Sequence, residues 1–218
     1  MEALRRLHNA CKRDLIQEWV KPGMLVLDCG CGRGGDWHKW KSVGATVCAI
    51  DPDEASLVEA EQRAKSINFG VHFLGKGTIV QAAFAGPFDV VCYNFSLHYI
   101  MDDFQNSIRA INCALKPGGL LIGIVPDPYR ASMIADKQGH YEDDLGNSFD
   151  IVGEKLVVKL SDGPFYADGP KAEPLLDYDL FIKELKNVGI YMLKWDKMVL
   201  QNTGKITDLY SKFIFKKM

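Results

Sequence analysis

The first feature of this chain that could do chemistry is a run of glycines between two acids, residues 28–36 with the sequence DCGCGRGGD. An apolar stretch precedes the run and a helix-like stretch follows it, so we expect a strand–loop–helix junction where the backbone approaches a ligand closely. A further acid, Asp51, ends the next strand-like stretch. A carboxylate there can accept both hydroxyls of a ribose. Asp28, directly before the glycines, favours a ligand with a positive amino or sulfonium group over a pyrophosphate.

Three alternatives stay open for this region. The glycines could form a tight turn that binds nothing. A dinucleotide of the NAD type is a second possibility, although the run fits that fingerprint only loosely. Asp51 could simply cap the helix that follows it.

Strand-like and helix-like stretches alternate over the first 125 residues. The patterns predict helices at 2–20, 36–42, 53–66 and 104–115, and strands at 24–28, 45–50, 71–74, 88–94 and 120–125. Continuously apolar strands separated by helices are typical of a parallel sheet covered on both faces, with right-handed crossovers. Ligands of such sheets bind at the carboxyl edge of the strands.

The pattern changes after Pro126. Residues 147–160 predict a hairpin with its turn near Gly153-Glu154, and a helix at 178–188 and strands at 190–195 and 212–215 follow. We therefore predict a single α/β domain over 1–218. Its parts are a cofactor-binding half (1–125), an insertion that forms a substrate lid over the carboxyl edge (126–176), and a closing helix and strands (177–218).

Length and composition exclude several classes of protein. The chain has 218 residues, of which 47% are hydrophobic and 25% charged, enough for one domain with a core. Mean hydropathy is −0.08, and no apolar run approaches the roughly 20 residues of a membrane span. The charged start lacks the apolar stretch of a secretory signal. Six cysteines without a C-x-x-C pair favour a reducing intracellular setting, and their spacing matches no common metal site, so we expect none.

Charge is unevenly distributed although the net charge is only −2. Residues 1–48 carry eight Lys or Arg against five acids, 136–180 carry four against eleven, and 181–218 carry eight against three. A polyanion could bind the basic ends and avoid the acidic middle. The alternative is that these are the solvated faces of a nearly neutral protein.

The glycine run and its acids resemble those of class I S-adenosylmethionine-dependent methyltransferases. Three stretches resemble one family among them, the mRNA cap guanine-N7 methyltransferases. Residues 8–12 (HNACK) are similar to the family's Asn-Asn-x-x-Lys entry helix. Residues 30–40 are similar to its Gly-Cys-Gly-Lys-Gly-Gly-Asp loop, with Arg33 in place of Lys. Residues 94–99 (NFSLHY) are similar to its Gln-Phe-x-x-His-Tyr motif. Weaker similarities at residues 146–148, 173–176 and Tyr210 extend the resemblance over nearly the whole chain.

The resemblance implies a doubly wound, mostly parallel seven-stranded sheet and S-adenosylmethionine as methyl donor. The donor would be held by Lys12, Asp28, Gly30, Gly32, Asp36, Asp51 and Asn94. The family has an acid after the third strand that reads the donor's adenine. Residues 74–79 (LGKGTI) contain none, and the backbone of Gly77 or Thr78 would take its place.

The resemblance also implies a substrate, the 5′ cap of RNA. The guanine would be held by Phe95, His98, Tyr99, Glu173 and Tyr210, and the cap ribose and phosphates approached by Asn9, Lys39 and Arg63. No side chain acts as general base, because the N-7 nitrogen carries a free lone pair. Guanylyltransferase and triphosphatase domains or subunits would be partners, and no membrane would be involved. The protein would work in the nucleus or cytoplasm, and in the cytoplasm if it belongs to a larger viral capping enzyme.

Other readings of these residues stay open. Lys12 could be a surface lysine, Glu173 an ordinary loop acid, and Phe95, His98, Tyr99 and Tyr210 core residues. The whole chain could be another class I methyltransferase, acting on a metabolite or protein, or a non-catalytic subunit of a capping complex.

Overall fold

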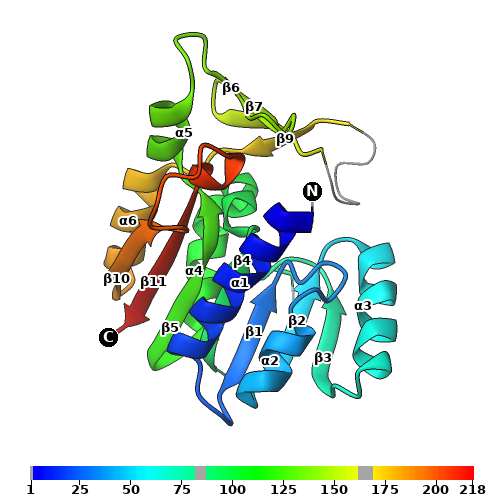
Figure 1. Cartoon of the computed structure of the whole chain (residues 1–218). Helices are drawn as coiled ribbons and strands as arrows, with labels where there is room; N and C mark the ends of the chain where they lie inside the picture. The colour runs from blue at the N-terminus through cyan, green and yellow to red at the C-terminus, as the bar shows by residue number, and fades with distance from the viewer. Residues whose placement is uncertain (1, 82–86, 162–168) are drawn as a thin grey trace.

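A seven-stranded sheet forms the centre of the computed structural model, which describes residues 2–81, 87–161 and 169–218 (Figure 1). The strand order is β10-β11-β5-β4-β1-β2-β3. The strands are β1 (Leu25–Cys29), β2 (Thr46–Asp51), β3 (Val71–Lys76), β4 (Phe88–Asn94), β5 (Leu115–Pro126), β10 (Ile190–Lys197) and β11 (Tyr210–Lys217). Strands β1 to β5 are parallel, and β11 runs antiparallel to both β5 and β10. The predicted doubly wound, mostly parallel sheet is confirmed.

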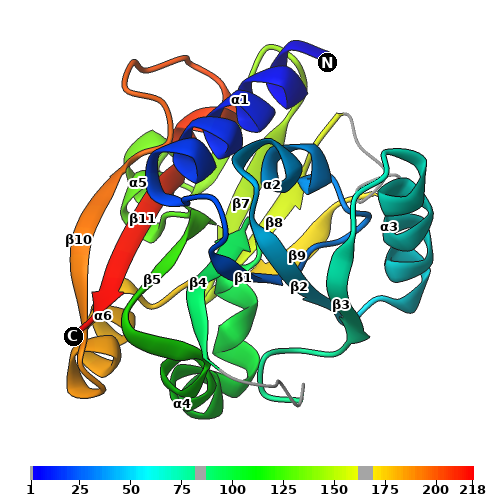
Figure 2. The ribbon, with the colours of Figure 1, turned by 90° about the horizontal axis from the view of Figure 1, so that it is seen from below.

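Helices cover both faces of the sheet (Figure 2). One buried cluster joins the sheet to α1 (Glu2–Trp19), α2 (Trp37–Val43) and α3 (Glu54–Ser66). A second cluster joins its other face to α4 (Phe104–Ala114) and α6 (Tyr178–Asn187). Burial from both sides explains why the central strands are almost continuously apolar. Among the described residues, no helix combines the length and apolar character needed to cross a bilayer.

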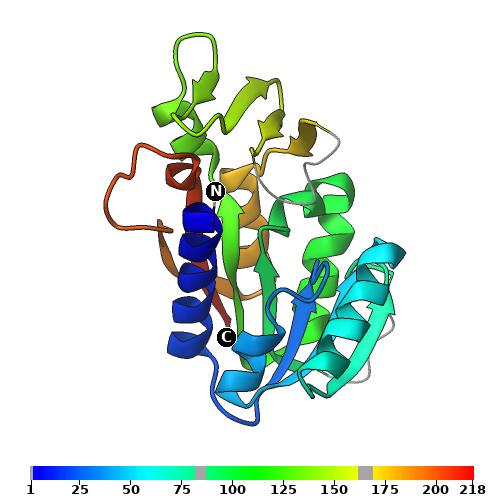
Figure 3. The ribbon, with the colours of Figure 1, turned by 45° about the vertical axis from the view of Figure 1, so that its right-hand side comes forward.

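A second, four-stranded sheet lies over the carboxyl edge of the first (Figures 1 and 3). It follows α5 (Pro128–Ile134) and consists of β6 (His140–Glu142), β7 (Ser148–Val152), β8 (Lys155–Lys159) and β9 (Lys171–Pro174), in that order and antiparallel throughout. The predicted hairpin is confirmed as β7 and β8. The patterns missed α5, β6 and β9; β6 and β9, with three and four residues, are too short to show an alternating pattern.

Strand β5 begins earlier than predicted. The glycines at 118 and 119 indicated a loop before Leu120, yet the strand starts at Leu115. Its pairing with β4 shifts between Phe88 and Val90, so the glycines are accommodated in an irregular stretch of strand. Two short 3-10 helices, η1 (Leu97–Asp103) and η3 (Ile206–Leu209), lead into α4 and β11.

Candidate active site

A cavity of about 790 Å³ opens at the carboxyl edge of the large sheet. Its walls come from α1, from the loops after β1, β2, β3 and β4, and from the starts of α3 and α4, with β9 and β11 completing them. The volume is in the range of cavities that take a small molecule or cofactor. The cavity lies where an open α/β sheet binds its ligand.

The glycine loop forms one wall of the cavity and depends on its glycines. Gly30 and Gly32 have φ values of 75° and 52°, in the left-handed region. A Cβ atom on Gly30 would lie 2.5 Å from the Cβ of Ser96, so no side chain fits there. The backbone amide of Gly32 donates to the Asp51 carboxylate at 2.7 Å. The loop is thus pinned to the end of β2.

Asp51 is not the cap of α3. Asp53 caps that helix, because its carboxylate accepts from the amides of Ala55 and Ser56. Asp51 instead accepts from the amides of Gly32 and Asp53, at 2.7 and 2.9 Å, and lines the cavity. The capping alternative for Asp51 is therefore excluded.

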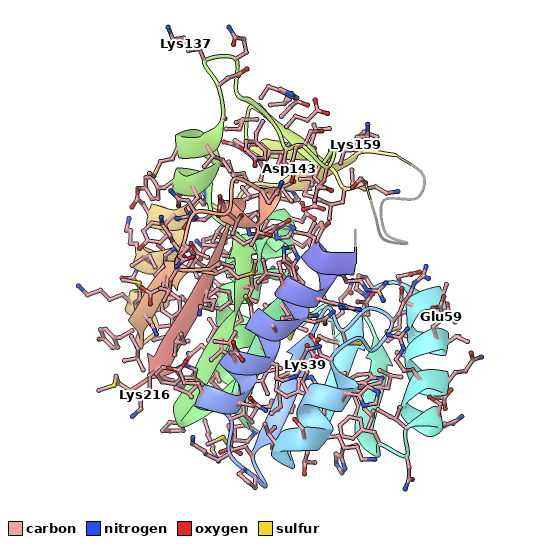
Figure 4. The ribbon with its side chains drawn as sticks, viewed as in Figure 1. Lys39, Glu59, Lys137, Asp143, Lys159 and Lys216 are labelled. Carbon is pink, nitrogen blue, oxygen red and sulfur yellow. The ribbon has the colours of Figure 1, made fainter. Side chains whose placement is uncertain are left out.

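A buried ionic network around Asp36 supports the loop from beneath. The ammonium groups of Lys12 and Lys39 each lie 2.7 Å from the Asp36 carboxylate, and the Asn94 amide donates to it at 3.1 Å. Burial opposes ionisation of Asp36, but the two ammonium groups outweigh it and lower its pKa. Lys39, labelled in Figure 4, also donates to the side chain of Asn9 at 2.9 Å. The network joins α1 to α2 and to the end of β4.

Asp28 is buried behind the loop. Its carboxylate accepts a hydrogen bond from the indole of Trp40 at 2.9 Å. Burial raises the pKa of Asp28, and the negative charge of Asp36 raises it further. Asp28 therefore contributes to the protein side of the loop and not to the cavity wall.

An aromatic group also lines the cavity. The ring of Phe95 stacks on that of His8 with centroids 5.2 Å apart and meets the edge of Tyr210 at 5.0 Å. Phe95 has a φ of 65°, an unusual value for a residue with a side chain and one that is often found at functional sites. Lys12 lies 5.9 Å from the centre of the Phe95 ring. The His8 Nε2 is 3.0 Å from the hydroxyl of Thr207, and burial together with nearby Lys12 lowers the pKa of His8 to about 4.

A polar group lies beside these rings. The Nε2 of His98 is 3.2 Å from the Oε2 of Glu173, and both residues are buried. Burial and the Glu173 carboxylate raise the pKa of the Tyr99 hydroxyl. Glu173 belongs to β9, where it pairs with Leu156 of β8. The small sheet thus delivers a buried carboxylate to residues that follow β4.

Residues 1–156 match the family model of the mRNA (guanine-N(7))-methyltransferase domain. The chain belongs to this family. An mRNA cap guanine-N(7) methyltransferase of Saccharomyces cerevisiae is 36% identical in an alignment 141 residues long, and the match covers 57% of this chain and 32% of the yeast protein. One of Caenorhabditis briggsae is 29% identical in an alignment 196 residues long, and the match covers 80% of this chain and 51% of the relative. The chain thus spans about a third to a half of the length of these relatives.

Solved structures support the fold of this cap methyltransferase family member. An S-adenosylmethionine-dependent methyltransferase from Clostridium acetobutylicum has a TM-score of 0.66 at 20% identity, covering 97% of this chain and 91% of the other. An N-methyltransferase from Bradyrhizobium japonicum, solved with S-adenosyl-L-homocysteine, has a TM-score of 0.62 at 15% identity, covering 98% and 86%. At these identities the similarity concerns the fold.

Most of the predicted site residues of this methyltransferase-family chain line the cavity at the carboxyl edge of the large sheet. Those that line it are Asn9, Lys12, Gly30, Gly32, Asp51, Gly77, Thr78, Phe95, His98, Tyr99, Glu173 and Tyr210. Three others, Asp28, Asp36 and Asn94, lie behind the wall in the contacts described above.

Two residues predicted to approach the cap phosphates require correction. Lys39 is buried, and its ammonium group is engaged by Asp36, Asn9 and the carbonyl oxygen of Gly35. Arg63 is exposed in the last turn of α3, whereas the start of that helix reaches the cavity through Ser56. Seven residues of helix separate the two positions by about 10 Å, so Arg63 lies away from the cavity.

Several lining residues of this family member were not predicted. They are Arg5, His8, Ser96, Asp102, Asp103 and Ser107. Two of them could have been predicted from the helical period, because Arg5 and His8 lie on the same face of α1 as Asn9 and Lys12. The others face the cavity only through the path of the chain after β4.

Proposed function

We propose that this chain transfers a methyl group from S-adenosylmethionine to the N-7 atom of the guanine in the 5′ cap of RNA. The observation that carries the proposal is the buried carboxylate of Glu173, 3.2 Å from His98, facing the cavity that also contains the glycine loop and Asp51. Membership of the cap methyltransferase family supports it.

The donor half of the cavity fits S-adenosylmethionine. Gly30 and Gly32 present only backbone to the cavity, and Asp51 offers a carboxylate to ribose hydroxyls. Lys12, a compact cation on the cavity wall, suits the donor's carboxylate. When bound, the sulfonium donor supplies an electrophilic methyl group. These residues bind and orient it.

The acceptor half fits guanine. The Watson–Crick edge of guanine presents two neighbouring donors, N-1 and the 2-amino group, and the Glu173 carboxylate can accept from both. Adenine presents an acceptor at N-1 and would be rejected. The Phe95 ring offers a face to the base, and a methylated, cationic guanine gains a cation–π interaction there.

No residue is needed as a general base. The N-7 atom of guanine has a free lone pair, so its attack on a methyl group removes no proton. Catalysis then rests on approach and alignment, which supply about 7–11 kcal/mol in favourable cases. The carboxylate of Glu173 also favours the positive charge that develops on the base.

Arg5 is our candidate for the cap phosphates. Among the described residues that line the cavity, the lysine and arginine side chains are those of Lys12 and Arg5. Lys12 is paired with Asp36, whereas Arg5 is exposed on the first turns of α1, where a triphosphate would leave the cavity. Arginine suits phosphate oxygens because its guanidinium donates in a planar fork.

The insertion at 126–176 acts as a lid in this proposal, because it carries Glu173 on β9. Residues 1–125 bind the donor and 177–218 close the sheet. We further propose that the chain works where capped RNA is made or translated, in the nucleus or cytoplasm, beside guanylyltransferase and triphosphatase activities on the same or other chains.

The decisive experiment is product identification. The chain is incubated with RNA ending in GpppA or GpppG and a methyl-labelled donor, and the RNA is digested to nucleosides. We expect label in 7-methylguanosine from the cap and none from RNA with a 5′ triphosphate. Label in another nucleoside, or in a protein or metabolite added as competitor, would overturn the proposal.

A further inference from the structure

Two side chains at the start of α4, Asp103 and Ser107, reach the cavity and have no role in the account above. Thr78 and Ile79, which follow β3, line the same cavity. That is the place where the sequence, LGKGTI at residues 74–79, lacks an acid. An acceptor that is absent after β3 is thus available from α4.

The geometry leaves both side chains available to a ligand. Asp103 directly precedes α4, yet its carboxylate makes no capping bond to the helix; its Oδ1 accepts from the Asn106 amide at 2.9 Å. Ser107 is 4% exposed, and its hydroxyl forms no hydrogen bond within the described ranges. Asp103 stands at the N-cap position and Ser107 in the first turns of α4, and both line the cavity.

The surroundings suit a flat, apolar ring. Ile50, Ile79 and Ile100 line the cavity and belong to one buried cluster. This apolar part adjoins the ribose-binding residue, because the amide of Gly77 donates to the backbone carbonyl of Asp51 at 3.0 Å. A base attached to a ribose at Asp51 would lie between the isoleucines with its polar edge toward α4.

We infer that Asp103 and Ser107 read the adenine ring of the methyl donor. The Asp103 carboxylate accepts from the 6-amino group, and the Ser107 hydroxyl donates to N-1. The two side chains therefore replace the acid that is missing after β3. This inference rests on the proposed function, since it concerns the donor of the same reaction.

Asp102 provides a matched control. It has the same side chain and lines the same cavity, but it faces the acceptor half. Burial, Glu173 and Asp102 together raise the pKa of the Tyr99 hydroxyl, and Tyr99 lies three residues before Asp102 on η1. Removing the charge of Asp102 tests whether any carboxylate at the cavity affects the preference between nucleosides.

The test compares two nucleosides by calorimetry on the intact chain, without turnover. S-adenosylhomocysteine carries the amino group and the N-1 acceptor, whereas S-inosylhomocysteine carries an oxygen and an N-1 donor instead. We expect the chain to prefer the adenosine compound at least tenfold. We expect Asp103→Asn to reduce this preference about tenfold, Ser107→Ala to reduce it several-fold, and Asp102→Asn to leave it unchanged.

The outcomes separate this inference from the proposed function. If the unmodified chain binds neither nucleoside, the donor assignment fails and both proposals fall. If it binds S-adenosylhomocysteine but Asp103→Asn and Ser107→Ala keep the original preference, only the adenine reading is overturned. Equal effects of Asp102→Asn and Asp103→Asn would indicate a general effect of charge and would also overturn it. Thermal melts check that each variant is folded.

Discussion

His98 and Glu173 approach each other to 3.2 Å from different sheets: His98 follows β4 of the large sheet, and Glu173 lies on β9 of the small one. Both side chains are buried. A buried carboxylate discriminates strongly between ligands, because a ligand that does not supply hydrogen-bond donors leaves the carboxylate oxygens without partners, which costs binding free energy. The proposed guanine site is therefore complete only when the small sheet covers the edge of the large one.

The first prediction concerns Glu173. In Glu173→Gln, one acceptor oxygen becomes a donor amide that faces the donors of guanine. We expect kcat/KM for cap methylation to fall by about a hundredfold or more, since charged hydrogen bonds contribute about 1.5–3 kcal/mol and a mismatched donor adds to the loss. The affinity for S-adenosylmethionine, measured by calorimetry, should change little. Glu142→Gln, on the exposed part of the same sheet, is the control. Equal loss of donor and cap binding would contradict the assignment.

The second prediction concerns Asp51. Asp51→Ala removes a carboxylate that lines the cavity and that accepts from the amides of Gly32 and Asp53. We expect the dissociation constant of S-adenosylmethionine to rise about ten- to a hundredfold. Asp51→Asn, which keeps one acceptor for the loop, should show a smaller loss of stability with a similar loss of affinity. A folded variant with unchanged affinity would remove Asp51 from the donor site.

The third prediction is that methyl transfer needs no base. If His98 removed a proton, the single-turnover rate would fall when the imidazole becomes protonated, and the pH profile would show an acidic limb. We expect His98→Asn to lower the rate through binding and geometry while the shape of the pH profile from about 5.5 to 9 stays the same. The measurement uses saturating donor and cap analogue. An acidic limb present in the unmodified chain and lost in the variant would contradict the base-free reaction.

The fourth prediction concerns His8 and acid stability. Burial, with Lys12 nearby, lowers the pKa of His8 from 6.5 to about 4, so the unfolded chain takes up a proton in this window before the folded chain does. The free energy of unfolding should therefore fall as pH falls from about 6.5 toward 4. His8 should account for about 2 kcal/mol of this loss between pH 7 and pH 5. Urea unfolding at both pH values measures it, because the loss should be smaller by this amount in His8→Asn than in the unmodified chain. His72→Asn, at an exposed position of β3, is the control.

The fifth prediction concerns the phosphates. Arg5→Ala should weaken binding of GpppA about three- to tenfold, because it removes an exposed guanidinium at the cavity. Guanosine, which has no phosphate, should bind equally to both proteins, and added salt should reduce the difference for GpppA. Arg13→Ala, an exposed change on the same helix but outside the cavity lining, is the control. Equal weakening by both changes would point to general attraction for anions.

Local patterns in the sequence determined most of the large sheet. The apolar stretches of β1 and β4, the glycine loop and Asp51 were all found, because strand and helix periods depend on residues close together in the chain. The same holds for the β7–β8 hairpin, whose turn residues are adjacent. Since parallel strands end at one edge of a sheet, the sequence also predicted where the ligand residues would meet.

Tertiary structure decided what each side chain can do. Lys39 and Arg63 are both cations of the predicted site, but packing against α1 buries one beside Asp36, and the length of α3 carries the other away from the cavity. Glu173 reaches His98 only through a four-residue strand that has no readable period. Sequence patterns report how a segment folds locally, whereas contacts between distant segments depend on how whole elements pack, and those contacts set the charge, burial and partners of every group in this site.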